Sequence, residues 1–249
     1  MLIEDKFLFL SLPRCVSTAF YVSCLKQGIL VKRVNEEIDE VNLKLDLTKE
    51  SDIKQLAHAH ETVSELRSKF GRSHQIITVR RNKYERFYSF YKKFCKELID
   101  NRFDIKMENY FEYFTNISPE NFFNFKDIKL TDDYAELTTK FKEMHNLDFS
   151  VHNNKIQYSF NSLIYFMLKP MSHWTEYESN IKWFDFTDLS KLETWVSNEL
   201  NKDFKLERVN SSEHRKLNPK MVVDKNFMDL YDKTYYNYDL DTKINRSLL

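Results

Sequence analysis

The stretch FLFLSLPRCVSTAFYVSCLKQG, residues 7–28, decides the expected fold because a strand, a loop and a helix follow one another within it. Residues 6–11 form an apolar run of strand length, which ends before the turn at Pro13. The helix is expected at 17–27, since Gly28 stands where a glycine commonly follows a helix. The stretch therefore predicts the first strand–loop–helix unit of an α/β fold.

A second unit of the same kind begins at QIITVR, residues 75–80, a β-branched run of strand length. Aromatic and apolar side chains follow at helical spacing over 84–99. Because strands that alternate with helices favour parallel pairing, we expect a central, mainly parallel sheet flanked by helices. The other expected strands lie at 30–34 and 181–186, and the other expected helices at 50–70, 131–145, 156–168, 189–200 and 224–238, with Thr187 or Asp188 as the cap of the helix at 189–200.

Length and composition favour one domain. A chain of 249 residues is long enough to bury the core of one large α/β domain. It contains only two glycines and four prolines, and no flexible linker separates parts of different composition. We therefore expect a single domain over 1–249, in which the less regular, aromatic-rich segment 103–175 forms a helical insertion.

The charges of the chain balance, with 38 basic and 38 acidic residues. Without an overall positive field, the chain lacks the driving force for non-specific binding to nucleic acid or to an anionic membrane, so an anion site must be local. The three cysteines, Cys15, Cys24 and Cys95, are an odd number without metal-ligand spacing. They favour reduced thiols in an intracellular protein over a disulfide framework or a zinc site.

The distribution of apolar residues argues against a membrane protein. No segment approaches the about 20 consecutive apolar residues that a membrane-spanning helix needs. The apolar stretch at 7–12 is short, and Glu4 and Asp5 precede it in place of the cationic start of a signal peptide. These features predict a soluble, cytoplasmic protein.

The loop LPRCVSTAF, residues 12–20, is the first candidate site, because it joins a strand to the start of a helix. Backbone N–H groups at such a turn and the positive end of the helix dipole attract anions. Arg14 adds a fixed charge, and Ser17 and Thr18 add hydroxyl donors, which favours a phosphate or sulfate ligand. The alternative is an ordinary helix cap beside a surface arginine. The loop lacks the glycines and the lysine of G-x-x-x-x-G-K-[ST], which disfavours a standard nucleoside-triphosphate loop.

The segment RRNKYERFYSFY, residues 80–91, is the second candidate anion site. Arg81 lies just beyond the strand at 75–80, and Ser89 lies eight residues later, inside the expected helix. A guanidinium and a hydroxyl brought together at the carboxyl end of a strand would bind a second phosphate. Between residues 67 and 86, seven basic residues accompany one acidic residue, which is informative in a neutral chain. The alternative is a solvated helix face, the usual place of a charge cluster.

The segment HAHE, residues 58–61, supplies candidate bases. His58 and His60 are two residues apart, so on a regular helix they would point about 200° apart and could not share a metal ion. An imidazole titrates near neutral pH, and one of them near a reacting hydroxyl could act as general base, with Glu61 as a competing base. The alternative is that each is an ordinary surface or core side chain.

In this order and spacing, the three motifs resemble those of the sulfotransferases that use 3′-phosphoadenosine 5′-phosphosulfate, especially the Golgi-type carbohydrate branch that includes heparan sulfate 2-O-sulfotransferase. PRCVSTAF is similar to the family's 5′-phosphosulfate loop, P-[KR]-x-x-S-T-x-F, and VRRNKYERFYSFY to its 3′-phosphate segment, R-[DN]-P-x-E-R-x-x-S-x-Y. HAHE resembles the His-x-His of the 2-O branch. Further along the chain, SHWTEY at 172–177 followed by IKWFDFTDL resembles downstream elements, and VNSSEHRKL at 209–217 resembles, more weakly, the adenosine-side loop.

The resemblance implies a P-loop-like three-layer fold and a role for each matching residue. His60, or else His58, would take the acceptor proton, and Arg14 would act electrostatically, since a guanidinium cannot readily donate a proton at neutral pH. Two positions depart from the usual family pattern, because Arg14 replaces a lysine and Lys83 replaces a proline. The residues that would bind the donor are Arg14, Cys15, Val16, Ser17, Thr18, Ala19, Arg81, Ser89 and Arg215.

The function implied by the resemblance is transfer of a sulfuryl group from 3′-phosphoadenosine 5′-phosphosulfate to an acceptor hydroxyl, with a carbohydrate as the expected acceptor and 103–175 on the acceptor side. No metal follows from this chemistry. Two alternatives stay open from the residues, namely a nucleotide or small-molecule kinase, and a non-catalytic module that binds a phosphonucleotide. The identity of the acceptor and the oligomeric state are not encoded in any motif.

Overall fold

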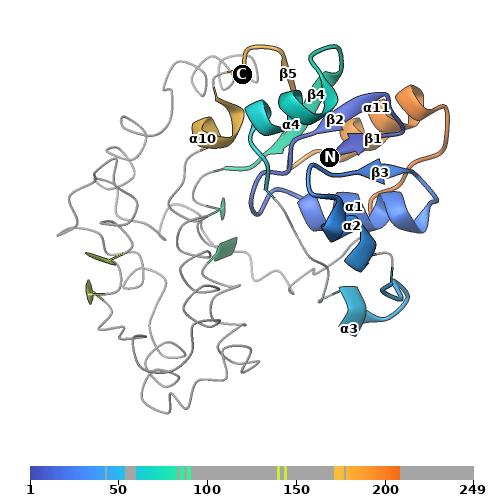
Figure 1. Ribbon diagram of the computed structural model, residues 1–249, viewed down its shortest axis with the longest axis horizontal. Coiled ribbons are helices and arrows are strands. Elements are labelled where there is room, and N and C mark those ends of the chain that lie inside the picture. Colours follow the sequence, from blue (N-terminus) through green and yellow to red (C-terminus); the bar gives the residue numbers. More distant parts are fainter. Residues whose placement is uncertain are drawn as a thin grey trace. The chain divides into compact units, whose positions relative to one another are not determined.

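The fold is described from a computed structural model (Figure 1). The chain divides into two compact units, and each is described by itself: Met1–Arg81 with His173–Arg215, and Asn82–Ser172 with Lys216–Leu249. The predicted insertion at 103–175 falls in the second unit, apart from its last three residues. The structure describes residues 1–42, 44–53, 60–82, 85–86, 89–90, 139–140, 143–144, 171–176 and 178–207.

The first unit is built on a five-stranded mixed sheet with the order β3-β1-β2-β4-β5. The strands are β1 (Leu2–Ile3), β2 (Phe7–Phe9), β3 (Val31–Lys32), β4 (Gln75–Arg80) and β5 (Ile181–Asp185). β2 pairs with β4 and β4 with β5 in parallel, whereas β1 is antiparallel to both β2 and β3. All strands except β1 therefore run in one direction, which confirms the predicted α/β character.

Strand β1 is an element that the sequence pattern did not predict. It forms a tight hairpin with β2, in which Glu4 and Asp5 have φ angles of 47° and 54°, and the Lys6 amide donates to the Ile3 carbonyl over 2.8 Å. A type I′ turn requires positive φ at both central positions. Such turns are recognised by glycine or asparagine, and this one has neither.

The helices next to the sheet include those expected at 17–27 and 189–200, but the helices at Glu36–Asn42 and Met171–Thr175 were not predicted. The described helices are α1 (Ser17–Lys26), α2 (Glu36–Asn42), α3 (Glu50–Ile53), α4 (Val63–Phe70), α10 (Met171–Thr175) and α11 (Ser190–Leu200). The prediction of one helix over 50–70 is wrong, because Thr62 begins α4 with a complete capping box to Glu65. Helix α11 is preceded by Leu189 at the N-cap, so neither Thr187 nor Asp188 holds that position.

The predictions for the remaining helices fall mostly on residues that are not described. Residues 85–86 and 89–90 are helical, as expected for the helix at 84–99, and so are 139–140 and 143–144 of the helix at 131–145. The predicted helices at 156–168 and 224–238 lie outside the described residues.

The end of α1 follows the sequence signal. Gly28 has a φ of 66°, and its amide donates to the Leu25 carbonyl over 3.1 Å. The next amide, that of Ile29, donates to the Cys24 carbonyl over 2.8 Å. This pair of bonds is the Schellman motif, in which glycine adopts the left-handed conformation at no steric cost.

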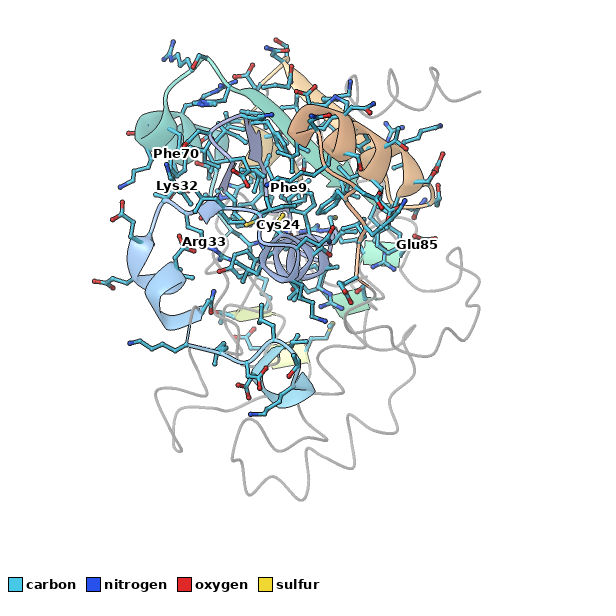
Figure 2. All side chains as sticks on the ribbon, turned by 90° about the vertical axis from the view of Figure 1, so that its right-hand side faces the viewer. Phe9, Cys24, Lys32, Arg33, Phe70 and Glu85 are labelled. Carbon is cyan, nitrogen blue, oxygen red and sulfur yellow. The ribbon has the colours of Figure 1, made fainter. Side chains whose placement is uncertain are left out.

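Alternation along β2 decides which helices cover which face of the sheet. Phe7 and Phe9 point to the same face, because side chains two residues apart in a strand do so. Phe9 stacks on Phe20 of α1 with a centroid distance of 3.9 Å, and Phe7 meets Trp195 of α11 edge-on at 4.9 Å. Helices α1 and α11 therefore share one face, and α4 lies on the other side of the sheet (Figure 2).

Candidate functional site

The candidate site lies where β2 and β4 end. These strands are parallel neighbours, so their carboxyl ends meet at one edge of the sheet, which is where ligands bind in open α/β sheets. Beyond the register pairs, the Leu10 amide donates to the Ile77 carbonyl over 2.9 Å, and the Thr78 hydroxyl donates to the Leu10 carbonyl over 2.7 Å. The start of the loop after β2 is therefore fixed to β4.

The loop at 12–16 has an unusual backbone. Arg14 and Val16 have φ angles of 64° and 69°, in the left-handed region, although neither is glycine. A β-branched residue there costs on the order of 1–3 kcal/mol, and such strain concentrates at functional sites. Alternation of left- and right-handed residues turns successive N–H groups inward, as in anion-binding nests. We call residues 12–16, with the start of α1, the anion loop.

Internal hydrogen bonds hold the anion loop. The Leu12 carbonyl accepts from the Cys15 amide over 3.2 Å and from the Ser17 hydroxyl over 2.8 Å. The Ser17 proton is thus directed into the loop in this geometry, and Ser17 shapes the loop. The N-cap of α1 is Val16, which makes no side-chain hydrogen bond to the helix. The positive end of the helix dipole is therefore balanced by no capping side chain at this position.

Three further predicted donor-binding residues lie in the same loop or in the first turn of α1. Cys15 is buried, whereas Thr18 and Ala19 are partly exposed. Their backbone belongs to the turn whose N–H groups lie at the positive end of the helix. The structure thus brings the predicted residues from Arg14 to Ala19 together in one continuous segment.

Arg81 is held against the anion loop. Its Nη1 donates to the Arg14 carbonyl oxygen over 3.4 Å, which joins two motifs that are 67 residues apart. The guanidinium also lies over the ring of Phe186, 4.1 Å from its centroid. Phe186 follows β5, and its amide donates to the Arg80 carbonyl over 2.9 Å. A cation held between an aromatic ring and a backbone carbonyl is oriented before any ligand binds.

The neighbouring Arg80 has a different environment. Its Nε lies 3.4 Å from the Asp185 carboxylate on the paired strand β5. Burial acts to raise the pKa of Asp185, but hydrogen bonds from Thr187 and the charge of Arg80 outweigh it and lower the pKa below its ordinary value. Arg80 is therefore engaged in an ion pair between strands, and Arg81 is the arginine that contacts the loop.

His60 lies beside the same loop. Its Nδ1 is 2.8 Å from the Ser11 carbonyl oxygen. A carbonyl can only accept, so Nδ1 carries the proton in the neutral ring and Nε2 has the lone pair. The ring is 6.0 Å from that of Trp174, which is buried and contacts His173 in turn. His60 is not on a helix, because α4 begins only at Val63.

Glu61, the competing base, has different surroundings. It is 5% exposed, and neither carboxylate oxygen has a hydrogen-bond partner among the described residues. Burial disfavours the charged form of the Met1 amine and lowers the pKa of that amine to about 6. The charge of Glu61 acts in the opposite direction and partly offsets this effect. Arg33 and Asp39 are the other charges around that amine. Glu61 thus belongs to a buried charge cluster at the β1 side of the sheet, whereas His60 contacts the loop.

For the other predicted site residues, the structure gives no position relative to the loop. Ser89 is buried in the second unit, together with Arg86, and its pairing with Arg81 stays a prediction. His58 and Arg215 lie outside the described residues. Sequence reasoning missed Phe186, although an aromatic residue at the very end of the strand expected at 181–186 was the available signal. It also missed the Ser11 carbonyl as the partner of His60, because no sequence signal marks such a backbone contact.

Two searches of the described residues give negative results. No group of three or more histidine, cysteine, aspartate or glutamate side chains is arranged to hold a metal ion there. Within the same residues, no helix has the length and apolar character needed to cross a membrane. Comparisons with protein-family models, with curated proteins and with solved structures find no match to this chain.

Proposed function

We propose that this protein is a sulfotransferase that moves the sulfuryl group of 3′-phosphoadenosine 5′-phosphosulfate to an acceptor hydroxyl, with a carbohydrate as the acceptor class, on a P-loop-like three-layer fold. The observation that carries the proposal is the hydrogen bond from the Arg81 side chain to the Arg14 carbonyl. It supports a common site for the two candidate anion motifs. His60, hydrogen-bonded to Ser11 directly before the anion loop, supplies a base next to them.

The anion loop suits the phosphosulfate end of the donor. That group presents several anionic oxygens, and it is bound best by converging N–H groups and fixed positive charge. The left-handed residues Arg14 and Val16 and the uncapped start of α1 supply such N–H groups. Arg14 supplies the charge, and its guanidinium remains protonated at any physiological pH.

Arg81 and Ser89 would hold the 3′-phosphate. A guanidinium offers up to five N–H donors in a fixed fork, and a hydroxyl adds one more. Binding this remote phosphate does not touch the reacting sulfur, so its binding energy serves to orient the donor. The stacking of Arg81 on Phe186 limits the orientations that the fork can adopt.

The reaction forms one bond and breaks one. The acceptor oxygen bonds to sulfur while the bond from sulfur to the 5′-phosphate oxygen breaks, and 3′,5′-adenosine bisphosphate leaves. The acceptor proton goes to Nε2 of His60, whose other nitrogen is held by the Ser11 carbonyl. General base catalysis of this kind contributes about 10²- to 10⁴-fold in rate. Arg14 and the loop N–H groups stabilise the charge that grows on the leaving oxygen, as in loose phosphoryl transfer.

Two measurements on the unmodified protein test the proposal. Calorimetry should detect binding of adenosine 3′,5′-bisphosphate without added metal, and labelled sulfate should pass from the donor to a member of a panel of sugar, lipid and phenol acceptors. Absence of nucleotide binding would overturn the proposal. Binding without transfer to any acceptor would favour the non-catalytic module, and magnesium-dependent binding of ATP in its place would favour a kinase.

A further inference from the structure

Glu176 joins two distant segments of the first unit at the start of α4. Its Oε2 accepts from the Ser64 amide over 2.6 Å, although the two residues are 112 positions apart in the sequence. Ser64 is the second residue of α4, and the first N–H groups of a helix have no backbone partner within it. A carboxylate there also faces the positive end of the helix dipole. The end of α10 is thus attached to the start of α4.

The backbone around Glu176 makes this attachment important for α10. The helix ends at Thr175, and Glu176 follows it with a φ of 48°, in the left-handed region. The Glu178 amide then donates to the Thr175 carbonyl over 2.9 Å. A helix of five residues is too short to be stable by itself, so its position depends on contacts with the rest of the fold. The bond from Ser64 is such a contact.

Trp174 links this attachment to His60. It lies in α10, two residues before Glu176, and is 3% exposed. Its ring centroid is 6.0 Å from that of His60, and the two ring planes are inclined by 59°. Because Nδ1 of His60 is also 2.8 Å from the Ser11 carbonyl oxygen, the imidazole is contacted both by the chain after β2 and by α10.

The two contacts restrain different movements of the imidazole. The bond from Nδ1 to Ser11 fixes one nitrogen, but the ring could still turn about that bond or exchange it for water. Turning would displace Nε2, the atom that takes the acceptor proton in our proposal. The ring of Trp174 occupies the space beside the imidazole and limits this movement. A misplacement of about 1 Å at a reacting group can lower a rate by about 10²-fold.

We propose that Glu176 is a positioning residue for His60, which acts by holding the end of α10, and with it Trp174, beside the imidazole. The inference rests on the proposed function, because it deepens the role of His60 as the base. Glu176 is exposed and has no part in donor binding or proton transfer in this proposal. Its effect on the reaction therefore passes through Trp174.

Two replacements of Glu176 separate the hydrogen bond from the charge. Glu176→Gln keeps an oxygen that accepts from the Ser64 amide, and kcat should stay close to that of the parent. Glu176→Asp keeps the charge but is one methylene shorter, so kcat should fall about tenfold while KM for the donor stays unchanged. Aspartate tolerates the left-handed backbone well, so strain at this position does not explain such a loss.

The tautomer of His60 gives a readout that needs neither donor nor acceptor. At a pH above the ordinary pKa of histidine, nitrogen-15 NMR of the full chain distinguishes a proton on Nδ1 from one on Nε2. The signals of His60 are those that disappear in His60→Ala. The parent and Glu176→Gln should carry the proton on Nδ1, whereas Glu176→Asp should show both tautomers, because its ring can leave the Ser11 carbonyl.

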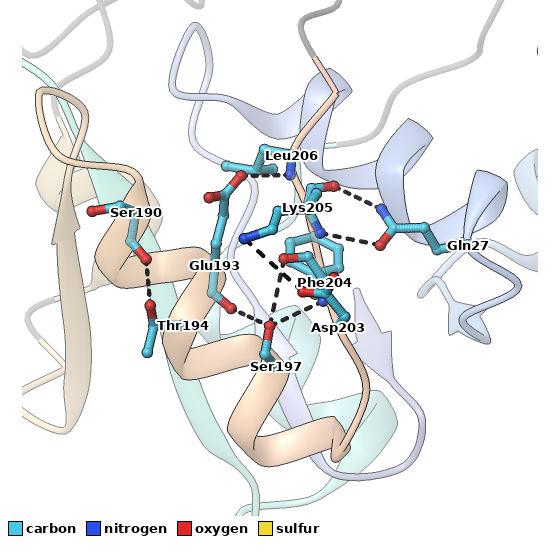
Figure 3. Close-up of polar contacts among 9 residues, drawn as sticks. All are labelled: Gln27, Ser190, Glu193, Thr194, Ser197, Asp203, Phe204, Lys205 and Leu206. Atoms are coloured by element: carbon cyan, nitrogen blue, oxygen red, sulfur yellow. Dashed lines mark hydrogen bonds and ion pairs between the residues drawn. The ribbon is translucent and has the colours of Figure 1, made fainter.

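Glu193 provides the matched control, because its Oε1 also accepts from the backbone of a separate segment. The donor is the Leu206 amide, over 2.8 Å (Figure 3). Glu193 lies on α11, which is on the other side of the sheet from α4. Glu193→Asp removes the same methylene and should leave both kcat and the tautomer of His60 unchanged. Equal effects in the two aspartate variants would show a general loss of structure and would overturn the positioning role.

A double-mutant cycle decides whether the effect passes through His60. In a His60→Ala background, Glu176→Asp should cost no further turnover, because the residue that it positions is already gone. A further loss in that background, or an unchanged tautomer or kcat in Glu176→Asp alone, would overturn the inference and leave the proposed function standing. If the parent transfers no sulfuryl group, the proposed function is contradicted, and the tautomer measurement still decides whether Glu176 positions His60.

Discussion

Two helices of the first unit, α1 and α4, begin in opposite ways. Thr62 and Glu65 close the start of α4 with reciprocal hydrogen bonds, in which the Thr62 amide donates to Glu65 over 2.6 Å and the Glu65 amide donates to Thr62 over 3.3 Å. The start of α1 has Val16 at the N-cap and no capping side chain. It also has two residues in the left-handed region, Arg14 and Val16.

This difference in capping distinguishes a helix start that only stabilises the fold from one that is a candidate binding site. A helix start whose N–H groups are met by its own side chains is stabilised without a ligand, whereas a strained and uncapped start keeps its dipole for an anion. The capped start of α4 also has a function, because it fixes the chain directly after His60. In our proposal, the start of α1 binds the anion, and the start of α4 holds His60, the general base, in position.

The largest expected effect comes from removing the proposed base, His60, which leaves both helix starts intact. His60→Ala should lower turnover by about 10²- to 10⁴-fold, because the acceptor proton loses its receiver. Affinity for adenosine 3′,5′-bisphosphate should stay close to that of the parent, since the proposal gives His60 a role in proton transfer and none in binding the nucleotide. Turnover of labelled donor and calorimetry measure the two quantities separately.

His74→Ala is the control for this prediction, because His74 lies just before β4, at the opposite edge of the sheet. It should change turnover little. Full activity in His60→Ala would transfer the base to His58 or Glu61.

The next effect tests the charge that the anion loop receives from β4. Arg81→Ala should weaken nucleotide binding by about 10- to 100-fold, because hydrogen bonds to a charged group contribute about 1.5–3 kcal/mol. Arg81→Lys should restore only part of this loss, since an ammonium lacks the planar fork that stacks on Phe186. The exposed Arg72, from the same basic segment, provides the control, as Arg72→Ala removes an equal charge away from the loop. Equal affinities for all variants would contradict the assignment of Arg81.

The sequence predicted local elements better than their partners. The strand at 75–80 has the expected bounds, and Gly28 ends α1 as expected, because both signals act over a few residues. The capping box of α4 was also readable, since Thr62 and Glu65 stand in the T-x-x-E pattern, yet apolar periodicity on both sides suggested one continuous helix.

Long-range contacts of the site were not predictable in this way. The Arg81 stack on Phe186 and the bond from His60 to Ser11 join segments that are far apart in the sequence, and only the strand order brings them together. The left-handed backbone at Arg14 and Val16 carries no sequence signal either, because such conformations are usually marked by glycine. The sequence predicted a parallel sheet, but only the structure shows which side chains meet at the ends of its strands.

A smaller effect breaks the capped start. Thr62→Ala should destabilise the protein by about 1 kcal/mol, since it removes the acceptor for the Glu65 amide. Thermal unfolding should show a lower midpoint, while Ser64→Ala, at an exposed position one residue into α4, should change it little. If Thr62→Ala left the midpoint unchanged, the capping box would not stabilise the folded protein. The two helix starts would then differ in geometry alone.

The smallest effect acts on the strained start and has the opposite sign. Val16→Gly should raise stability by up to about 1 kcal/mol, because the left-handed conformation costs a β-branched residue on the order of 1–3 kcal/mol, partly offset by the greater entropy of glycine in the unfolded chain. Nucleotide affinity should nevertheless fall a few-fold, as a glycine lets the loop leave the geometry in which its N–H groups converge.

Asn201→Gly is the matched control, since Asn201 also has a positive φ of 52° but ends α11 away from the loop. It should add a few tenths of a kcal/mol without changing affinity, because asparagine tolerates this conformation better than valine. If Val16→Gly and Asn201→Gly changed stability and affinity alike, the strain at Val16 would have no connection with binding.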